Sequence, residues 1–175
     1  MESQETILVG YKGILRALER TLDGLSEEDL AWQPTPDCNS IGWLVWHLTR
    51  AQDSVISNIL KEEQLWIKDG WHTKFGRSPD AMDSGAGHTP KDLASFKSPD
   101  SEILLGYHRA VLERTKQRLP TLSKTDLDKV VEGMPFQPPP TVGALLMIIL
   151  DDCLQHAGQA AYIRGMRQGI GWQKF

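Results

Sequence analysis

Three side chains with metal-binding chemistry lie in two similar apolar segments of the sequence. His47 follows the residues SIGWLVW, and Asp152 and His156 lie in a segment that begins TVGAL. Residues four apart share one face of a helix, so Asp152 and His156 can point at the same spot. Two imidazoles and one carboxylate suit a divalent transition metal and leave coordination positions open, as a catalytic metal requires. The sequence therefore predicts a metal site formed by His47, Asp152 and His156.

Each part of this ligand set also has a simpler interpretation. An aspartate and a histidine four residues apart are common by chance, and they can bond to each other or to the backbone. His47 lies between Trp46 and Leu48 and can equally be a core histidine. The two segments together favour the metal, because polar groups buried inside apolar helices are costly unless a partner satisfies them.

Four long stretches with helical periodicity must position these residues. The apolar stripes predict helices over residues 5–23, 40–61, 100–118 and 141–166. Ser40 and Thr141 are the expected N-caps of the second and fourth helices. Alternating strand patterns are nearly absent, although residues 127–134 can pair briefly. The sequence predicts an all-α, antiparallel four-helix bundle that forms a single domain over residues 1–175, with long connections after the second and third helices.

The connection at residues 70–99 is rich in Gly and Pro and longer than most loops. Its aromatic and basic residues favour an ordered lid over disorder. Thr89 followed by Pro90 predicts a short helix within it, with Thr89 as the N-cap and Pro90 in the first turn. His72 and His88 also lie on this connection, and either can approach the open face of the metal.

Bulk properties exclude several classes of function. The chain has 175 residues, of which 40% are hydrophobic and 24% charged, as expected for a globular domain. A net charge of −4 disfavours nucleic acid and anionic membranes as partners. The longest apolar run, residues 142–150, is too short to span a bilayer. Two cysteines make no disulfide framework, and no signal peptide is visible, so we expect a cytoplasmic protein.

The two segments resemble the DinB-like superfamily of four-helix-bundle metalloproteins, which includes mycothiol- and bacillithiol-dependent S-transferases. The resemblance is carried by SIGWLVWHL at residues 40–48 and DDCLQHAGQ at residues 151–159, and it covers nearly the whole chain. It implies that a histidine on the second helix and an H-x-x-x-H pair on the last helix bind a metal, often zinc or nickel. Asp152 stands in place of the first histidine of that pair, which bears on which metal binds and how tightly.

These features predict a divalent-metal-dependent thiol transferase or isomerase that uses a low-molecular-weight thiol, such as mycothiol, on a small electrophile. A zinc or nickel ion would bind the thiol sulfur and lower its pKa. The alternative is a non-catalytic, stress-associated bundle whose metal stabilises helix packing. A hydrolase that uses metal-bound hydroxide is a third interpretation. We also expect a homodimer, because Leu30 and Trp32 are candidates for exposed apolar residues.

Four further residues near the predicted site have expected roles. Gln159 lies close to one helical turn after the second histidine of the site, where it can bond a metal-bound water or substrate, but it is expected to orient that ligand or pack. Cys153 points about 100° away from Asp152 around the helix and is expected to be a buried thiol. His108 is expected on the surface or in the core rather than at a metal, and Arg164 is expected to form a surface salt bridge.

Overall fold

The computed structural model describes residues 3–133 and 136–172, and four long helices dominate it. These helices are α1 (Ser3–Leu22), α3 (Ile41–Leu60), α7 (Ser101–Arg118) and α9 (Val142–Gln168). Within the described residues the only strand-like pairing is an isolated antiparallel bridge between Val130 and Thr141. The predicted all-α four-helix bundle is therefore confirmed. The predicted pairing over residues 127–134 shrinks to this bridge, and residue 134 lies outside the described residues.

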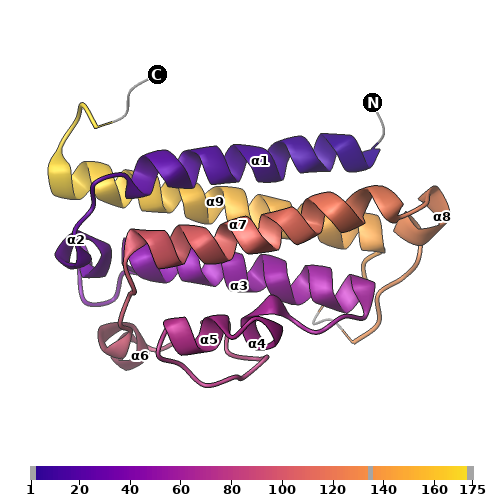
Figure 1. Cartoon of the computed structure of the whole chain (residues 1–175), viewed down its shortest axis with the longest axis horizontal. Coiled ribbons are helices and arrows are strands. Elements are labelled where there is room, and N and C mark those ends of the chain that lie inside the picture. Colours follow the sequence, from indigo (N-terminus) through magenta and orange to yellow (C-terminus); the bar gives the residue numbers. More distant parts are fainter. Residues whose placement is uncertain (1–2, 134–135, 173–175) are drawn as a thin grey trace.

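The four helices form a square in which α3 packs against α9 and α7, and α1 packs against the same two helices. The path of the chain makes α3 antiparallel to α9 and α1 antiparallel to α7 (Figure 1). The long connection after α3 returns the chain to the end of the bundle at which α3 begins, so α7 runs parallel to α3 (Figure 1). This arrangement brings the two segments with the predicted ligands side by side.

The helices begin where the capping residues predict. The Ser40 hydroxyl accepts a hydrogen bond from the Trp43 backbone amide, and the Thr141 hydroxyl accepts one from the Ala144 amide. These bonds satisfy amides that would otherwise have no partner in the first turn of α3 and α9. Helix α3 ends at Lys61, which takes the left-handed conformation. The caps fix the register in which both helices present their side chains.

The connection after α3 is ordered and contains three short helices, α4 (Leu65–Lys68), α5 (Trp71–Lys74) and α6 (Pro90–Ser95). Helix α6 confirms the predicted Thr89 cap. Helices α4 and α5 were not predicted, because four residues are too few to show a helical period. All three lie beside α3, on the side away from α1 (Figure 1).

Three further short helices were also not predicted from the sequence. They are α2 (Glu27–Ala31), the 3₁₀ helix η1 (Leu119–Thr121) and α8 (Lys124–Leu127). Helix α2 packs on α3 and buries Leu30 completely. The expectation that Leu30 is exposed is therefore wrong, and Trp32 is only partly exposed. The homodimer remains a prediction, without Leu30 as its support.

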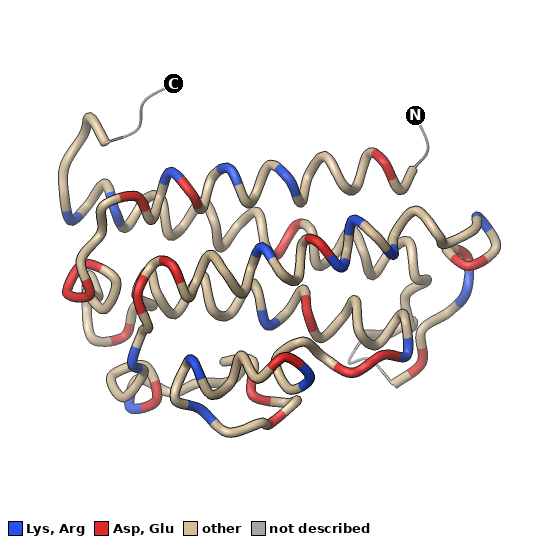
Figure 2. Tube along the Cα trace, viewed as in Figure 1, with Lys and Arg blue, Asp and Glu red and all other residues tan. Residues whose placement is uncertain are grey.

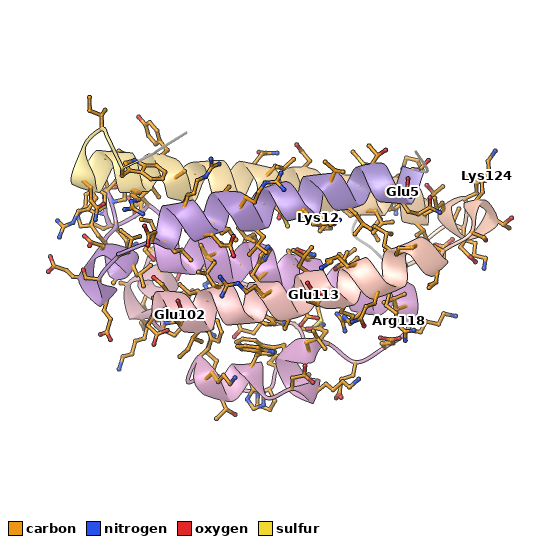
Figure 3. All side chains as sticks on the ribbon, turned by 45° about the horizontal axis from the view of Figure 1, so that its top comes forward. Glu5, Lys12, Glu102, Glu113, Arg118 and Lys124 are labelled. Atoms are coloured by element: carbon orange, nitrogen blue, oxygen red, sulfur yellow. The ribbon has the colours of Figure 1, made fainter. Side chains whose placement is uncertain are left out.

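Charged residues are frequent on the outer surface of α1 and α7 (Figure 2). Figure 2 shows acidic and basic residues interspersed along α1 and α7. Figure 3 labels exposed examples on these two helices, Glu5, Lys12, Glu102, Glu113 and Arg118. No helix in residues 3–133 or 136–172 combines the length and the apolar character that a membrane span needs.

Candidate metal centre

The structure brings together the three residues predicted to bind a metal. His47 comes from α3, and Asp152 and His156 come from the facing side of α9. One donor atom from each residue lies within 4.8 Å of the other two. The two imidazole rings meet edge to face, with 4.8 Å between their centroids. Residues about a hundred positions apart in the sequence thus form one cluster of donor atoms.

His47 is held by contacts on two sides. Its Nδ1 donates a hydrogen bond to the Ser84 carbonyl over 2.5 Å, and its ring stacks on Trp43 with centroids 4.7 Å apart. A carbonyl only accepts, so the proton of the neutral ring lies on Nδ1 and the Nε2 lone pair is free for a metal. Burial lowers the pKa of His47. The ring is therefore neutral at physiological pH and already in the tautomer that a metal needs.

Asp152 and His156 contact each other across one turn of α9. His156 Nε2 lies 3.4 Å from Asp152 Oδ1, and His156 Nδ1 donates to Gln159 Oε1 over 2.8 Å. The hydrogen bond to Asp152 raises the pKa of His156, and the same bond lowers the pKa of Asp152. When His156 is protonated, these two side chains form an ion pair. Gln159 orients His156 as Ser84 orients His47.

The donor set fits a divalent transition metal. Two imidazole nitrogens and one carboxylate oxygen are ligands that zinc and its neighbours accept. Two ligands of one zinc ion lie at most about 4 Å apart, so the three atoms need only a modest contraction to share an ion. The Asp152 side chain is 37% exposed and that of His156 is 18% exposed. One side of the cluster therefore faces solvent, where further ligands can enter.

A strap formed by residues 80–85 places the carbonyl that fixes His47. The side chain of Arg50 is fully buried, and it donates to the backbone carbonyls of Asp83 at 2.9 Å and Ala81 at 3.0 Å. Gly85 closes the strap with a φ of 87°, and a Cβ atom there would lie 2.7 Å from the Trp43 ring. Only glycine lets the strap lie this close to Trp43.

Sequence reasoning missed both Ser84 and Arg50. Ser84 acts through its backbone carbonyl, which every residue type has, so the sequence cannot indicate this role. Arg50 did leave a signal, because an arginine inside an apolar helix must find partners if it is buried. Its other partners include Gln64 Oε1 at 2.7 Å and the Tyr107 hydroxyl at 3.2 Å. Arg50 thus ties the strap, the start of α4 and α7 to α3.

The structure does not place His72 or His88 in the cluster. His88 Nδ1 accepts a hydrogen bond from Trp43 Nε1 over 3.1 Å, and its Nε2 lies 3.8 Å from Asp83 Oδ1. His72 Nδ1 bonds to the Arg77 carbonyl. His72 therefore packs within the connection, whereas His88 packs against Trp43 and Trp46 of α3 and contributes to the aromatic wall behind His47.

The neighbouring residues on α9 separate into those that face the cluster and those that do not. Asp151 is exposed and accepts a hydrogen bond from Gln155. Cys153 is fully buried, its thiol lies 3.4 Å from the Leu48 carbonyl, and burial raises its pKa. Cys153 is thus the unreactive buried thiol that the sequence predicted. Asp152 is the aspartate on the side of His156.

Two other expectations have clear outcomes. His108 is a core histidine, fully buried against Thr49, and burial lowers its pKa to about 4. Arg164 does not form the expected surface salt bridge. It is buried, and its Nη1 donates to the carbonyls of Arg20 and Thr21 at 2.8 and 2.9 Å. These are free carbonyls in the last turn of α1, so a cation there is stabilised by the helix end.

Comparisons with known proteins agree with this fold. A family model described as the DinB superfamily matches residues 11–160. A crystal structure described as the conserved protein of locus from Enterococcus faecalis superposes with a TM-score of 0.86 and 28% sequence identity. That match covers 95% of this chain and 97% of the other. No curated protein matches the chain.

Proposed function

Since this chain belongs to the DinB superfamily, we propose that it is a divalent-metal-dependent transferase or isomerase acting with a low-molecular-weight thiol on a small electrophile. His47, Asp152 and His156 would hold the metal, with zinc or nickel as the expected ion. When bound, the ion supplies a Lewis acid that takes up the thiol sulfur and lowers its pKa.

One observation carries this proposal, namely a three-ligand cluster with an exposed side. Structural zinc sites are closed by four protein ligands, whereas catalytic sites keep a position open. Among the described residues the cluster offers three ligands, and Asp152 and His156 border solvent. A thiol and its electrophile can therefore reach the ion from that side.

The residues around the cluster support catalysis by fixing it in advance. The Ser84 carbonyl holds the His47 ring, and Gln159 holds the His156 ring, so each Nε2 already points at the cluster. Such outer contacts sharpen both the geometry and the affinity of metal sites. One carboxylate and two neutral imidazoles also leave positive charge on a divalent ion, which favours a thiolate over a thiol.

A non-catalytic metal-binding bundle is the second candidate. The observation in its favour is that the ligands come from α3 and α9, so an ion would cross-link two long helices. In that case the metal chiefly contributes folding free energy. The exposed side of the cluster has no purpose in such a protein, which is why we favour the enzyme.

The variant His47→Ala separates the two candidates. An enzyme should lose thiol transfer while keeping its helical fold, and a structural metal protein should chiefly lose thermal stability. The assay combines the metal-loaded protein with mycothiol, bacillithiol, coenzyme A or glutathione and an aryl halide electrophile. His72→Ala is the matched control, because His72 lies outside the cluster. Full transfer activity in a demonstrably metal-free sample would reject both candidates.

A further inference from the structure

An open groove of about 730 Å³ lies beside the candidate metal centre. One wall is the last part of α9, from Gly158 to Met166, and the other is formed by residues 34–39 with Leu44 of α3. This volume falls within the range of small-molecule sites, which run from about 300 to 1,000 Å³. The groove thus has the size for a substrate and lies on the two helices that carry the predicted ligands.

Gln159 joins the groove to the cluster. Its side chain lines the groove, and its Oε1 accepts the hydrogen bond from His156 Nδ1 at 2.8 Å. On the opposite wall, Leu44 lies three residues before His47 on α3, close to one helical turn away. A molecule in the groove therefore contacts residues that lie next to the predicted metal ligands on both helices.

The walls of the groove are mainly apolar. Leu44 and Ile163 are buried at its base, whereas Tyr162 is 73% exposed and Met166 is 52% exposed. Large apolar side chains left in water at the rim are surfaces that an apolar ligand would cover. Such exposed apolar patches mark binding sites in proteins of this size.

The charges of the groove restrict the ligand further. None of the described residues that line it is Lys or Arg, and its one charged side chain is Asp37. A carboxylate or phosphate placed in the groove would find no cation and would face this aspartate. The groove therefore suits a neutral group, with amides such as Gln159 available for one or two hydrogen bonds.

We propose that this groove binds the neutral, apolar body of the electrophile, an aryl or alkyl group, and directs its reactive atom toward the metal centre. This assignment rests on the proposed function for the identity of the reaction. The binding itself needs neither metal nor thiol, because the walls that form the groove are already in place.

Gly158 provides a variant that fills the groove without disturbing the helix. A Cβ atom at this position would meet no other atom within 4 Å, so a side chain there enters open space. Leucine also favours a helix more than glycine does. Gly13→Leu on α1 is the matched control, because a Cβ atom there meets only the flexible end of Arg16, at 3.7 Å.

The first experiment measures binding of a neutral apolar fluorophore, N-phenyl-1-naphthylamine, to metal-free protein. We expect Gly158→Leu to weaken binding at least about tenfold, since displacing two methylene-sized contacts has an effect of this order. Gly13→Leu should bind like the unaltered protein. Equal binding by Gly158→Leu and the unaltered protein would overturn the proposal. Tyr162→Ala, which removes an exposed wall residue, gives a second variant that should also weaken binding.

The second experiment uses Cys38 as a reporter of occupancy. Cys38 lines the groove and is partly exposed, whereas Cys153, the other cysteine of the chain, is buried. The fluorophore should slow alkylation of Cys38 by N-ethylmaleimide in the unaltered protein and in Gly13→Leu, but not in Gly158→Leu. Unchanged alkylation at saturating fluorophore would reject the groove as the binding site.

A kinetic experiment then links the groove to the reaction. In the loaded enzyme, Gly158→Leu should raise KM for a neutral aryl electrophile several-fold and leave kcat close to its original value. An equal rise in KM for a small polar electrophile that has no aryl or alkyl body would contradict the assignment. If the unaltered protein transfers no thiol, the proposed function fails while the fluorophore experiments still decide whether the groove binds apolar molecules.

Discussion

Helices α3 and α9 open with similar sequences but hold their predicted ligands in different ways. On α3, His47 packs against Trp43 and donates a hydrogen bond to the Ser84 carbonyl of the strap, and these two contacts fix its ring. On α9, Asp152 and His156 lie at a partly exposed edge and bond to each other. The α3 half holds an imidazole whose Nε2 is free, whereas the α9 half is a bonded pair of carboxylate and imidazole that a metal would have to separate.

This difference would give the two helices different roles in the proposed metal site. A rigid, desolvated ligand fixes where the ion lies, because its ring has no alternative partner for Nε2 among the described contacts. The exposed pair tunes how tightly the ion is held, because its proton competes with the metal. Changes on α9 should therefore alter affinity directly, whereas changes around α3 should act through the position of the ring.

The largest effect expected from this comparison concerns the two adjacent aspartates of α9. Asp152→Ala should weaken metal binding by about 10–100-fold or more, since even changes to outer contacts have effects of that size. Asp151→Ala should leave affinity nearly unchanged, because Asp151 bonds to Gln155 on the exposed face. Asp152→His should keep a site and tighten it. Competitive titration against a chelator measures all three variants.

The opposite result for the two aspartates would show that a different face of α9 binds the metal. If Asp151→Ala lost the metal while Asp152→Ala kept it, the assignment of all three ligands would fail. A common loss in both variants would instead indicate damage to α9, which circular dichroism would reveal.

A smaller effect is expected at the strap on the α3 side. Gly85→Ala should lower metal affinity about tenfold, the lower range for changes in outer contacts, because the added Cβ pushes the strap off Trp43. It should also cost about 1–2 kcal/mol of folding stability for a left-handed alanine. Gly87→Ala is the matched control, because its φ is 79° and a Cβ atom there meets nothing within 4 Å.

Gly87→Ala loses folding stability to the left-handed alanine but leaves the strap in place. Thermal unfolding should therefore shift in both variants, whereas chelator titration should shift only in Gly85→Ala. Equal affinity of the two variants would show that the Ser84 carbonyl does not position His47.

The smallest effect expected is the dependence on pH. His156 has a raised pKa because it bonds to Asp152, so a metal must displace a proton whenever the pH lies below that pKa. Affinity should rise with pH by at most about tenfold per unit, corresponding to one proton released for each metal bound. Asp152→Asn should flatten this dependence, because it removes the cause of the shift. Proton release is measured by titration in weakly buffered solution.

The same pair sets the sign of the pH effect on the metal-free fold. The raised pKa of His156 contributes stability below its ordinary value of 6.5, and this contribution is lost as the pH rises through the raised value. The lowered pKa of Asp152 contributes stability above its ordinary value of 3.8, which is lost as the pH falls through the lowered value. The pair of Asp152 and His156 should therefore increase the folding stability of the metal-free protein in the weakly acidic range between these limits.

The long helices and the ligand spacing could be predicted because they depend on local rules. Ser40 and Thr141 cap their helices as their residue types require, and the apolar stripes set the bundle. The spacing of four residues placed Asp152 beside His156 on one face. Each of these statements needs only one helix at a time.

The remaining features depend on contacts between distant parts of the chain. The Ser84 carbonyl is a backbone group, so no residue type announces it. Leu30 is buried only because α2 folds back on α3, and Arg164 is buried only because the end of α1 lies beside it. The groove likewise needs residues 34–39 and the end of α9 together. Periodicity within one segment carries no information about such pairs.

The pairing of α3 with α9 has a consequence during protein synthesis. His47 leaves the ribosome about a hundred residues before His156. At about 5–20 residues per second, translation leaves the first ligand without its partners for at least roughly five seconds. The early part of the chain can therefore form α1 and α3, but it cannot assemble the cluster. An ion held by all three residues can be taken up only after α9 has been made, so loading would report that translation has passed the last helix.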